Sequence, residues 1–206
     1  MNSPSVNVKA GRNIRQLSLT NLEQFFLIIG EKKFRAKQVW EWLWQKHALS
    51  FADMTNLSKE LRQKLGENFS LPALSIDATQ YSADGTVKTR FKTHEGHLCE
   101  GVLIPTETRY TACVSSQIGC SLSCRFCATG YIERKRNLDF DEIYDEAVLI
   151  NQLCEQVYSK KLSNIVFMGM GEPLLNYKNV LKAIERITAE DGLAMSPRRI
   201  TVSTAG

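Results

Sequence analysis

The chain has 206 residues, of which 43% are hydrophobic, and its net charge is +4. This is enough for one substantial core and a small second domain, so we expect a folded, soluble protein. Six cysteines in a chain of this length are too few for a disulfide-rich secreted miniprotein. The sequence has no run of eighteen apolar residues and no apolar stretch of the kind that a secretory signal needs, so we expect a cytoplasmic protein without a membrane segment.

The positive charge is concentrated near the N-terminus. Residues 1–70 carry eleven Lys and Arg against six Asp and Glu, whereas the remainder carries fifteen against sixteen. A modestly basic domain beside a near-neutral one is compatible with RNA binding, but many solvated helical surfaces have the same composition. Charge alone therefore leaves both interpretations open.

Helical periodicity predicts a small N-terminal helical domain over residues 1–75. Thr20 is the predicted cap of the first helix, the second helix covers residues 35–47, and the third follows Ser58. The tryptophans of the second helix recur at helical spacing. This favours a buried core over a surface that stacks on RNA bases.

Strand signals dominate the rest of the chain. Residues 76–105 are predicted to form a linker and a β-hairpin, with strands at 88–93 and 97–104. Residues 106–206 then alternate as β-α-β-α-β, with the elements at 109–114, 141–157, 163–167, 177–189 and 199–203. This order predicts an α/β fold with a parallel sheet and right-handed crossovers, in which ligands bind at the carboxyl ends of the strands.

Three cysteines follow the first strand of that alternation. They are Cys120, Cys124 and Cys127, and the aromatic Phe126 directly precedes the last of them. A structural zinc site needs four protein ligands, whereas an iron–sulfur cluster held by three cysteines keeps one iron open for another ligand. A zinc knuckle and a group of reduced core thiols are the alternatives to a cluster.

The CxxxCxPheC spacing resembles the signature of radical S-adenosylmethionine (SAM) enzymes, which implies a 4Fe–4S cluster and SAM as cofactors. Two further features follow the later strands at the same expected edge. Glu172, in a GEP-like turn, is predicted to accept hydrogen bonds from the SAM ammonium group, and Gly171 lets the backbone approach closely. Ser203 is either a SAM ligand or an ordinary strand-end hydroxyl.

Four longer stretches make the resemblance to radical SAM enzymes more specific. They are residues 99–105, 112–120, 167–176 and 200–206. Together they resemble the RlmN/Cfr family of radical SAM RNA methyltransferases, along the whole chain. The resemblance implies a partial (β/α) radical SAM barrel, about half of it present, after the helical domain. It also implies methylation of adenosine C2 in 23S rRNA and tRNA through a methyl-cysteine intermediate. Methylation at C8, as in the antibiotic-resistance branch, stays an alternative.

The same resemblance implies roles for two further residues. Glu100 matches the family's proton acceptor, and Cys113 matches the cysteine that attacks the thioether sulfur and releases the product as a transient disulfide. Taken without the resemblance, Glu100 is an exposed strand carboxylate and Cys113 a buried strand thiol. The implied partners are 23S rRNA, tRNA and an electron donor such as flavodoxin or ferredoxin, and we expect a monomer.

The family's methyl-carrying cysteine lies near its C-terminus, whereas this sequence stops at Gly206 in an expected strand-to-helix turn. We therefore expect a fragment, a truncated product or a split protein. The alternative functions are an inactive remnant that retains SAM or RNA binding, a different radical SAM enzyme, and an iron–sulfur electron carrier. The electron carrier ranks last because it needs neither the GEP-like turn nor the helical domain.

Overall fold

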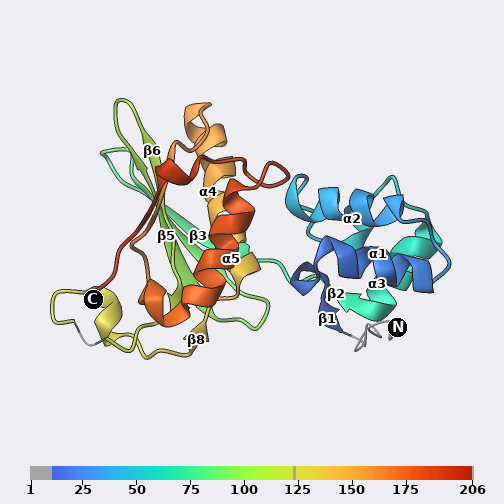
Figure 1. The fold of residues 1–206 in the computed structure, drawn as a ribbon. Coiled ribbons are helices and arrows are strands. Elements are labelled where there is room, and N and C mark those ends of the chain that lie inside the picture. The colour runs from blue at the N-terminus through green and yellow to red at the C-terminus, as the bar shows by residue number, and fades with distance from the viewer. Residues whose placement is uncertain (1–10, 123, 206) are drawn as a thin grey trace. The chain divides into compact units, whose positions relative to one another are not determined.

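The computed structural model describes residues 11–122 and 124–205. The chain divides into two compact units, Met1–Pro72 and Ala73–Gly206. Figure 1 shows that the described part of the first unit is helical and that the second is built around a sheet. Among the described residues, no helix is both long enough and apolar enough to cross a membrane.

Three helices form the first unit. The elements are β1 (Arg12–Asn13), α1 (Leu19–Ile28), α2 (Phe34–Trp44), α3 (Lys59–Asn68) and β2 (Phe69–Ser70), and β1 pairs with β2 in parallel. Phe25, Phe26, Trp44 and Leu65 lie in the core between the helices and are almost fully buried. The prediction that the second helix buries its aromatic face is confirmed for Trp44, because the apolar stripes of three short amphipathic helices have only one another to pack against.

The helix boundaries differ from the predictions at two places. Ser18 caps α1, because its hydroxyl accepts a hydrogen bond from the Asn21 amide at 3.2 Å, so the prediction of Thr20 as the cap is wrong. Ser18 offers the same capping group two residues earlier, which lets the helix begin sooner. Ser58 caps α3 as predicted. The second helix ends at Trp44, three residues before the predicted end, and His47 adopts a left-handed conformation with φ 53°.

The second unit contains a six-stranded sheet with the order β10-β9-β6-β5-β4-β3. The strands are β3 (Ser75–Tyr81), β4 (Val87–Lys92), β5 (Leu98–Pro105), β6 (Tyr110–Cys113), β9 (Asn164–Phe167) and β10 (Ile200–Val202). Strands β6, β9 and β10 are parallel, whereas β3 to β6 are antiparallel neighbours. The predicted hairpin therefore continues the same sheet as the parallel strands.

Two crossover helices connect the parallel strands. They are α4 (Phe140–Tyr158) and α5 (Tyr177–Thr188), so the predicted β-α-β-α-β order is confirmed. Asp139 and Glu142 form a capping box at the start of α4. The buried face of α4 includes Ile143, Ala147, Ile150 and Cys154, whereas Val157 in the last turn is 41% exposed.

Helix α4 packs on one face of the sheet, and glycine allows the close approach. A Cβ added at Gly101 would lie 2.8 Å from Cδ1 of Ile150 and 2.9 Å from the Phe91 ring. Phe91 and Cys99 are fully buried on this face. The strand residues that alternate with them lie on the opposite face, which the described residues leave partly exposed.

The buried face of β4 supplies a test of this packing. We expect Phe91→Ala to lower the free energy of unfolding of the sheet unit by about 3–5 kcal/mol, because it removes a fully buried ring next to Ile150. Chemical denaturation followed by circular dichroism measures the change. The matched control is Lys92→Ala on the exposed face of the same strand, which should change stability little. Equal losses for both variants would contradict this assignment of faces.

Candidate active site

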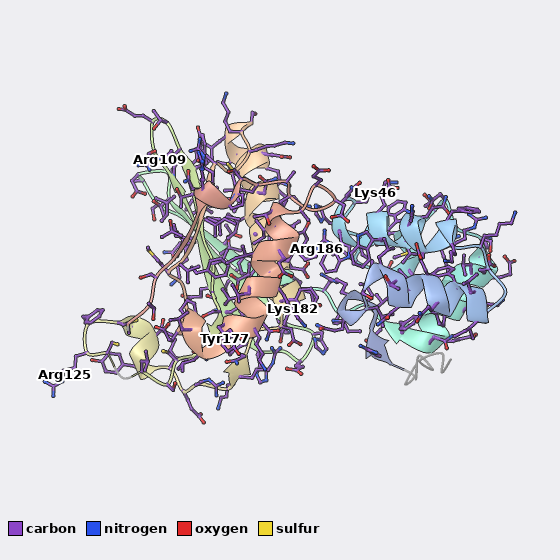
Figure 2. All side chains as sticks on the ribbon, viewed as in Figure 1. Lys46, Arg109, Arg125, Tyr177, Lys182 and Arg186 are labelled. Atoms are coloured by element: carbon purple, nitrogen blue, oxygen red, sulfur yellow. The ribbon has the colours of Figure 1, made fainter. Side chains whose placement is uncertain are left out.

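The cysteine loop leaves the sheet after β6 and is held by a small pair of strands. Strands β7 (Gln117–Ile118) and β8 (Arg136–Asn137) are antiparallel and flank the loop on either side. At Gly119 the backbone has φ 73°, and an added Cβ would lie 2.3 Å from the Glu133 carbonyl oxygen. Only glycine fits this close approach of the two ends of the loop. Arg125 extends from the loop tip into solvent (Figure 2).

A cavity of about 350 Å³ brings together all of the predicted cofactor residues. This volume lies in the range of sites for small molecules and cofactors. The predicted residues that line it are Cys120, Cys124, Cys127, Gly171, Glu172 and Ser203. They come from three chain segments that follow β6, β9 and β10, so the expectation that these motifs meet at the carboxyl edge of the parallel strands is met by the geometry.

Glu172 is buried and connects two of these segments. Its Oε1 accepts a hydrogen bond from the Leu174 amide at 3.0 Å, and its Oε2 accepts one from the Ala205 amide at 2.9 Å. Burial alone would raise the pKa of Glu172, but these amides and the Thr204 side chain outweigh it and lower the pKa. The carboxylate is therefore ionised at neutral pH, and with three donors on its two oxygens it keeps a lone pair for a ligand.

Gly171 precedes this carboxylate in a conformation that suits glycine. Its φ is 92°, and an added Cβ would lie 2.4 Å from Cβ of Gln117. The Gln117 side chain accepts a hydrogen bond from the Glu172 amide at 3.0 Å and donates one to Asn137 at 2.7 Å. Gln117 thus fixes the GEP-like turn against both strands that hold the cysteine loop.

Asn176 makes a second connection of the same kind. Its side-chain amide donates to the carbonyl oxygens of Ser116 at 2.7 Å and Leu138 at 2.8 Å, which lie before and after the cysteine loop. Arg136 adds an ion pair with Glu142 at 2.7 Å, so the exit of the loop is also attached to the start of α4. The sequence did not predict Gln117 or Asn176 as site residues, although they lie in the stretches 112–120 and 167–176 that carry the family resemblance.

A buried carboxyl group lies beneath these segments. Glu146 accepts a hydrogen bond from the Ser115 amide at 2.7 Å and one from the Cys99 thiol at 3.1 Å. The Ser115 hydroxyl in turn donates to the Glu100 carbonyl oxygen at 2.6 Å and accepts from the Met170 amide at 2.9 Å. Glu146 and Ser115 together therefore connect β5, the exit of β6 and the loop after β9.

Burial determines the charge state of this carboxyl group. It raises the pKa of Glu146 to about 8, because no water reaches the ionised form, and the hydrogen bonds from Ser115 and Cys99 only partly oppose this. Sequence reasoning missed Glu146. A signal was available, since Glu146 lies three residues after Ile143 on the apolar stripe of α4.

Glu100 and Cys113 lie outside the cysteine cavity but share one face of the sheet. Cross-strand pairing places Arg90 opposite Glu100 and Val102 opposite Cys113, and opposed residues point to the same side. Glu100 lines a shallow cavity of about 150 Å³. Its carboxylate forms an ion pair with Lys88 at 2.8 Å, and both side chains are partly exposed.

The cysteines differ in acidity. Hydrogen bonding from the Thr129 backbone lowers the pKa of Cys127, which favours the thiolate that a metal centre needs. Burial raises the pKa of Cys113, and burial next to Glu146 also raises that of Cys99. All six cysteines are free thiols, so the disulfide expected as a transient species is not a feature of this structure.

The donor set fits a cluster better than a single ion. Within the described residues, no three His, Cys, Asp or Glu side chains are close enough together to hold one metal ion. A zinc site needs its ligands around one point, whereas each of three cysteines binds a different iron of a 4Fe–4S cluster. Three thiols around one cavity, with the pKa of Cys127 lowered by hydrogen bonding from the Thr129 backbone, suit the larger centre.

Comparisons with known proteins agree with this geometry. Residues 114–206 match the radical SAM superfamily, and residues 12–71 match the ribosomal RNA large subunit methyltransferase N-terminal domain. A crystal structure of a radical SAM methyltransferase from Sphaerobacter thermophilus is similar, with a TM-score of 0.83 and 36% identity, over 95% of this chain and 57% of that one. The fold and the cysteine loop thus define a radical SAM protein with a partial barrel.

The curated relatives point to one family within the radical SAM proteins. The chain is 56% identical to a probable dual-specificity RNA methyltransferase RlmN from Cytophaga hutchinsonii, over 100% of this chain and 56% of the relative. It is 47% identical to a dual-specificity RNA methyltransferase RlmN from Geobacter sulfurreducens, over 94% of this chain and 52% of the relative. The chain belongs to the RlmN family, as the sequence motifs predicted.

Two further points come from these comparisons. The radical SAM superfamily implies SAM and a 4Fe–4S cluster as cofactors, and the residues around the cysteine cavity fit both groups. The chain spans about half the length of the curated relatives it matches, since it covers 56% and 52% of the two described above.

The difference in cysteine acidity predicts an order of reactivity. In the chain without a cluster at pH 7.5, we expect iodoacetamide to modify Cys127 before Cys113, because the thiolate is the nucleophile and the pKa of Cys127 is lowered whereas that of Cys113 is raised. Peptide mass spectrometry after short exposures measures the order. Denaturation should abolish the difference. Equal rates in the folded chain would contradict it.

The raised pKa of Glu146 predicts how stability depends on pH. The folded chain keeps a proton on this carboxyl group up to about pH 8, whereas the unfolded chain releases it at an ordinary carboxyl pKa. Below the unfolded pKa the stabilisation is complete. It is lost as the pH rises toward 8, by at most about 1.4 kcal/mol per pH unit.

Glu146→Gln should remove this part of the pH dependence, because a neutral amide has no proton to lose. Denaturation curves across the pH range measure it. The matched control is Glu155→Gln, an exposed position on the same helix, which should retain the wild-type slope. A wild-type slope in Glu146→Gln would exclude a neutral buried carboxyl group.

Proposed function

We propose that the chain supplies the cofactor-binding half and part of the catalytic face of a radical SAM RNA methyltransferase, which methylates C2 of adenosine in 23S rRNA and tRNA through a methyl-cysteine intermediate. The observation that carries the proposal is the cavity of about 350 Å³ at which three cysteines, the GEP-like turn and Ser203 meet. The names of the relatives, dual-specificity RNA methyltransferases, support the substrate class.

Each side chain around the cavity has a distinct task. Cys120, Cys124 and Cys127 would hold the cluster, and they line the same cavity as Glu172. Glu172 accepts a hydrogen bond from the SAM ammonium group through its remaining lone pair. Ser203 adds a hydroxyl contact, and Gly171 lets the ligand approach the backbone. When bound, the cluster and SAM supply a 5′-deoxyadenosyl radical.

Glu100 and Cys113 act on the RNA. Glu100 accepts the proton from the substituted adenine carbon, for which its side chain needs to be accessible, and it is partly exposed in its ion pair with Lys88. Cys113, as a thiolate, attacks the sulfur of the thioether and forms a transient disulfide with the methyl-carrying cysteine, while the bond from that sulfur to the methylene carbon breaks. The methylene carbon leaves with the electron pair, which the adenine ring delocalises, and takes up a proton to become the methyl group. Because its pKa is raised, Cys113 has to lose its proton to a nearby base before this attack, which keeps it unreactive until then.

The remaining roles follow from this assignment. The two compact units divide the work, with a helical unit that contributes to RNA binding and a sheet unit that carries the cofactors. The enzyme is a cytoplasmic monomer that receives electrons from a donor such as flavodoxin or ferredoxin. A cluster of this kind is suited to a reducing compartment, in which cysteines stay reduced and available to bind it.

Anaerobic reconstitution tests the proposal. We expect the chain to bind one 4Fe–4S cluster and, with dithionite and SAM, to release 5′-deoxyadenosine, because the cysteines and Glu172 line one cavity. Replacing Cys120, Cys124 and Cys127 together with Ala should abolish both. Absorption spectroscopy, iron and sulfide analysis and chromatography measure these results.

Two variants separate the roles. Cys113→Ala should leave SAM cleavage unchanged, whereas Glu172→Ala should weaken SAM binding by roughly 1–3 kcal/mol, if one charge-assisted hydrogen bond is lost. We expect no 2-methyladenosine from these 206 residues alone, because the family's methyl-carrying cysteine has no assigned counterpart among them. Stoichiometric zinc without iron, or 2-methyladenosine made by this chain alone, would contradict the division of roles.

A further inference from the structure

Strand β4 presents a row of cations on its exposed face. Lys88, Arg90 and Lys92 are exposed and alternate with Val87, Thr89 and Phe91, which are buried toward α4. Three positive side chains at a spacing of two residues therefore lie along one line, about 7 Å apart from one to the next. The sequence pattern of this stretch predicted only a strand of a hairpin.

The row lies on the same face as both proposed catalytic residues. Arg90 is directly opposite Glu100, and Lys88 is opposite Val102, which is itself opposite Cys113 on the next strand. Adjacent strands are about 4.8 Å apart, so Cys113 is two strand spacings from Lys88. The row of cations and Glu100 are therefore open to the same ligand.

Neighbouring carboxylates hold two of the cations in place. Lys88 forms its ion pair with Glu100 at 2.8 Å, and Nε of Arg90 donates to Asp77 at 2.6 Å. The Lys88 and Arg90 side chains are about half exposed, so these pairs contribute little to stability. An incoming phosphate can accept hydrogen bonds from the same cations without a large loss, and the side chains are already extended across the face.

We propose that Lys88 and Arg90, with Lys92 beside them, form a subsite that binds backbone phosphate of the RNA next to the target adenosine. This inference rests on the proposed function, because it places the RNA on the face that carries Glu100. Lys88 also acts as a positioning residue, since the same ammonium group holds the carboxylate of Glu100 beside the bound nucleotide.

Binding of a labelled RNA tests the subsite. The probe is a fluorescein-labelled RNA stem-loop with an unpaired adenosine in its loop, and fluorescence anisotropy gives its affinity for the 206-residue chain between about 50 and 200 mM salt. We expect Lys88→Ala and Arg90→Ala each to weaken binding roughly 3- to 10-fold at low salt and to reduce the slope of log affinity against log salt by about 1. The matched control, Lys161→Ala, changes an exposed lysine before β9 and should bind as wild type does.

A second set of variants separates phosphate binding from the charge left on Glu100. Lys88→Ala exposes an unpaired carboxylate, which repels RNA by itself. Glu100→Gln should bind RNA at least as tightly as wild type, because Lys88 is then released from its ion pair. The double variant Lys88→Ala, Glu100→Gln should still lose the same salt slope relative to Glu100→Gln. Circular dichroism confirms that each variant is folded.

The outcomes distinguish this inference from the proposed function. If wild type binds the RNA and both Lys88→Ala and Arg90→Ala keep its affinity and salt slope, the subsite is wrong and the proposed function stands. If Lys161→Ala loses as much as Lys88→Ala, the binding is general electrostatic attraction and the subsite is also wrong. If wild type does not bind the RNA at all, both the subsite and the proposed RNA substrate are wrong.

Discussion

The hydrogen bonds around the buried Glu146 carboxyl group are the constraint on which the candidate site depends. Through Ser115 and Cys99 they fix the exit of β6 against β5, and Ser115 extends the connection to Met170 in the loop after β9. A buried polar group that is fully hydrogen-bonded specifies one arrangement of its neighbours, whereas a partly bonded one is costly. The cysteine loop and the GEP-like turn therefore leave the sheet in a fixed relation to each other.

Much of the site could be predicted because its signals are local. The cysteine spacing, the GEP-like turn and the alternation of strands and helices all lie in short windows, and the rule that ligands bind at the carboxyl ends of parallel strands then brings them together. The helix limits were less predictable. Ser18 and Thr20 both offer a capping hydroxyl, and only the packing of α1 decides between them.

The contacts that sequence reasoning missed depend on strand register and on helix orientation. Lys88 and Glu100 are twelve residues apart, and they meet because the turn at 93–97 sets the pairing of β4 with β5. Gln117 and Glu172 are 55 residues apart and meet across two loops. In the sequence, Glu146 resembles an ordinary carboxylate on a helix. Its burial is evident only in the structure, where α4 packs on the sheet with this side chain inward. Periodicity could have indicated its burial but not its partners.

The hydrogen bond from the Ala205 amide to Glu172 links ligand occupancy to the backbone that follows β10. Linkage is reciprocal, so any change in the affinity of this carboxylate for a bound ammonium group changes, by the same factor, the equilibrium between docked and undocked forms of that backbone. In the proposed function, the Glu172 carboxylate thus binds both the SAM ammonium group and the Ala205 amide. Under the proposed function, occupancy of the cofactor site and the position of the backbone after β10 are therefore coupled through one carboxylate.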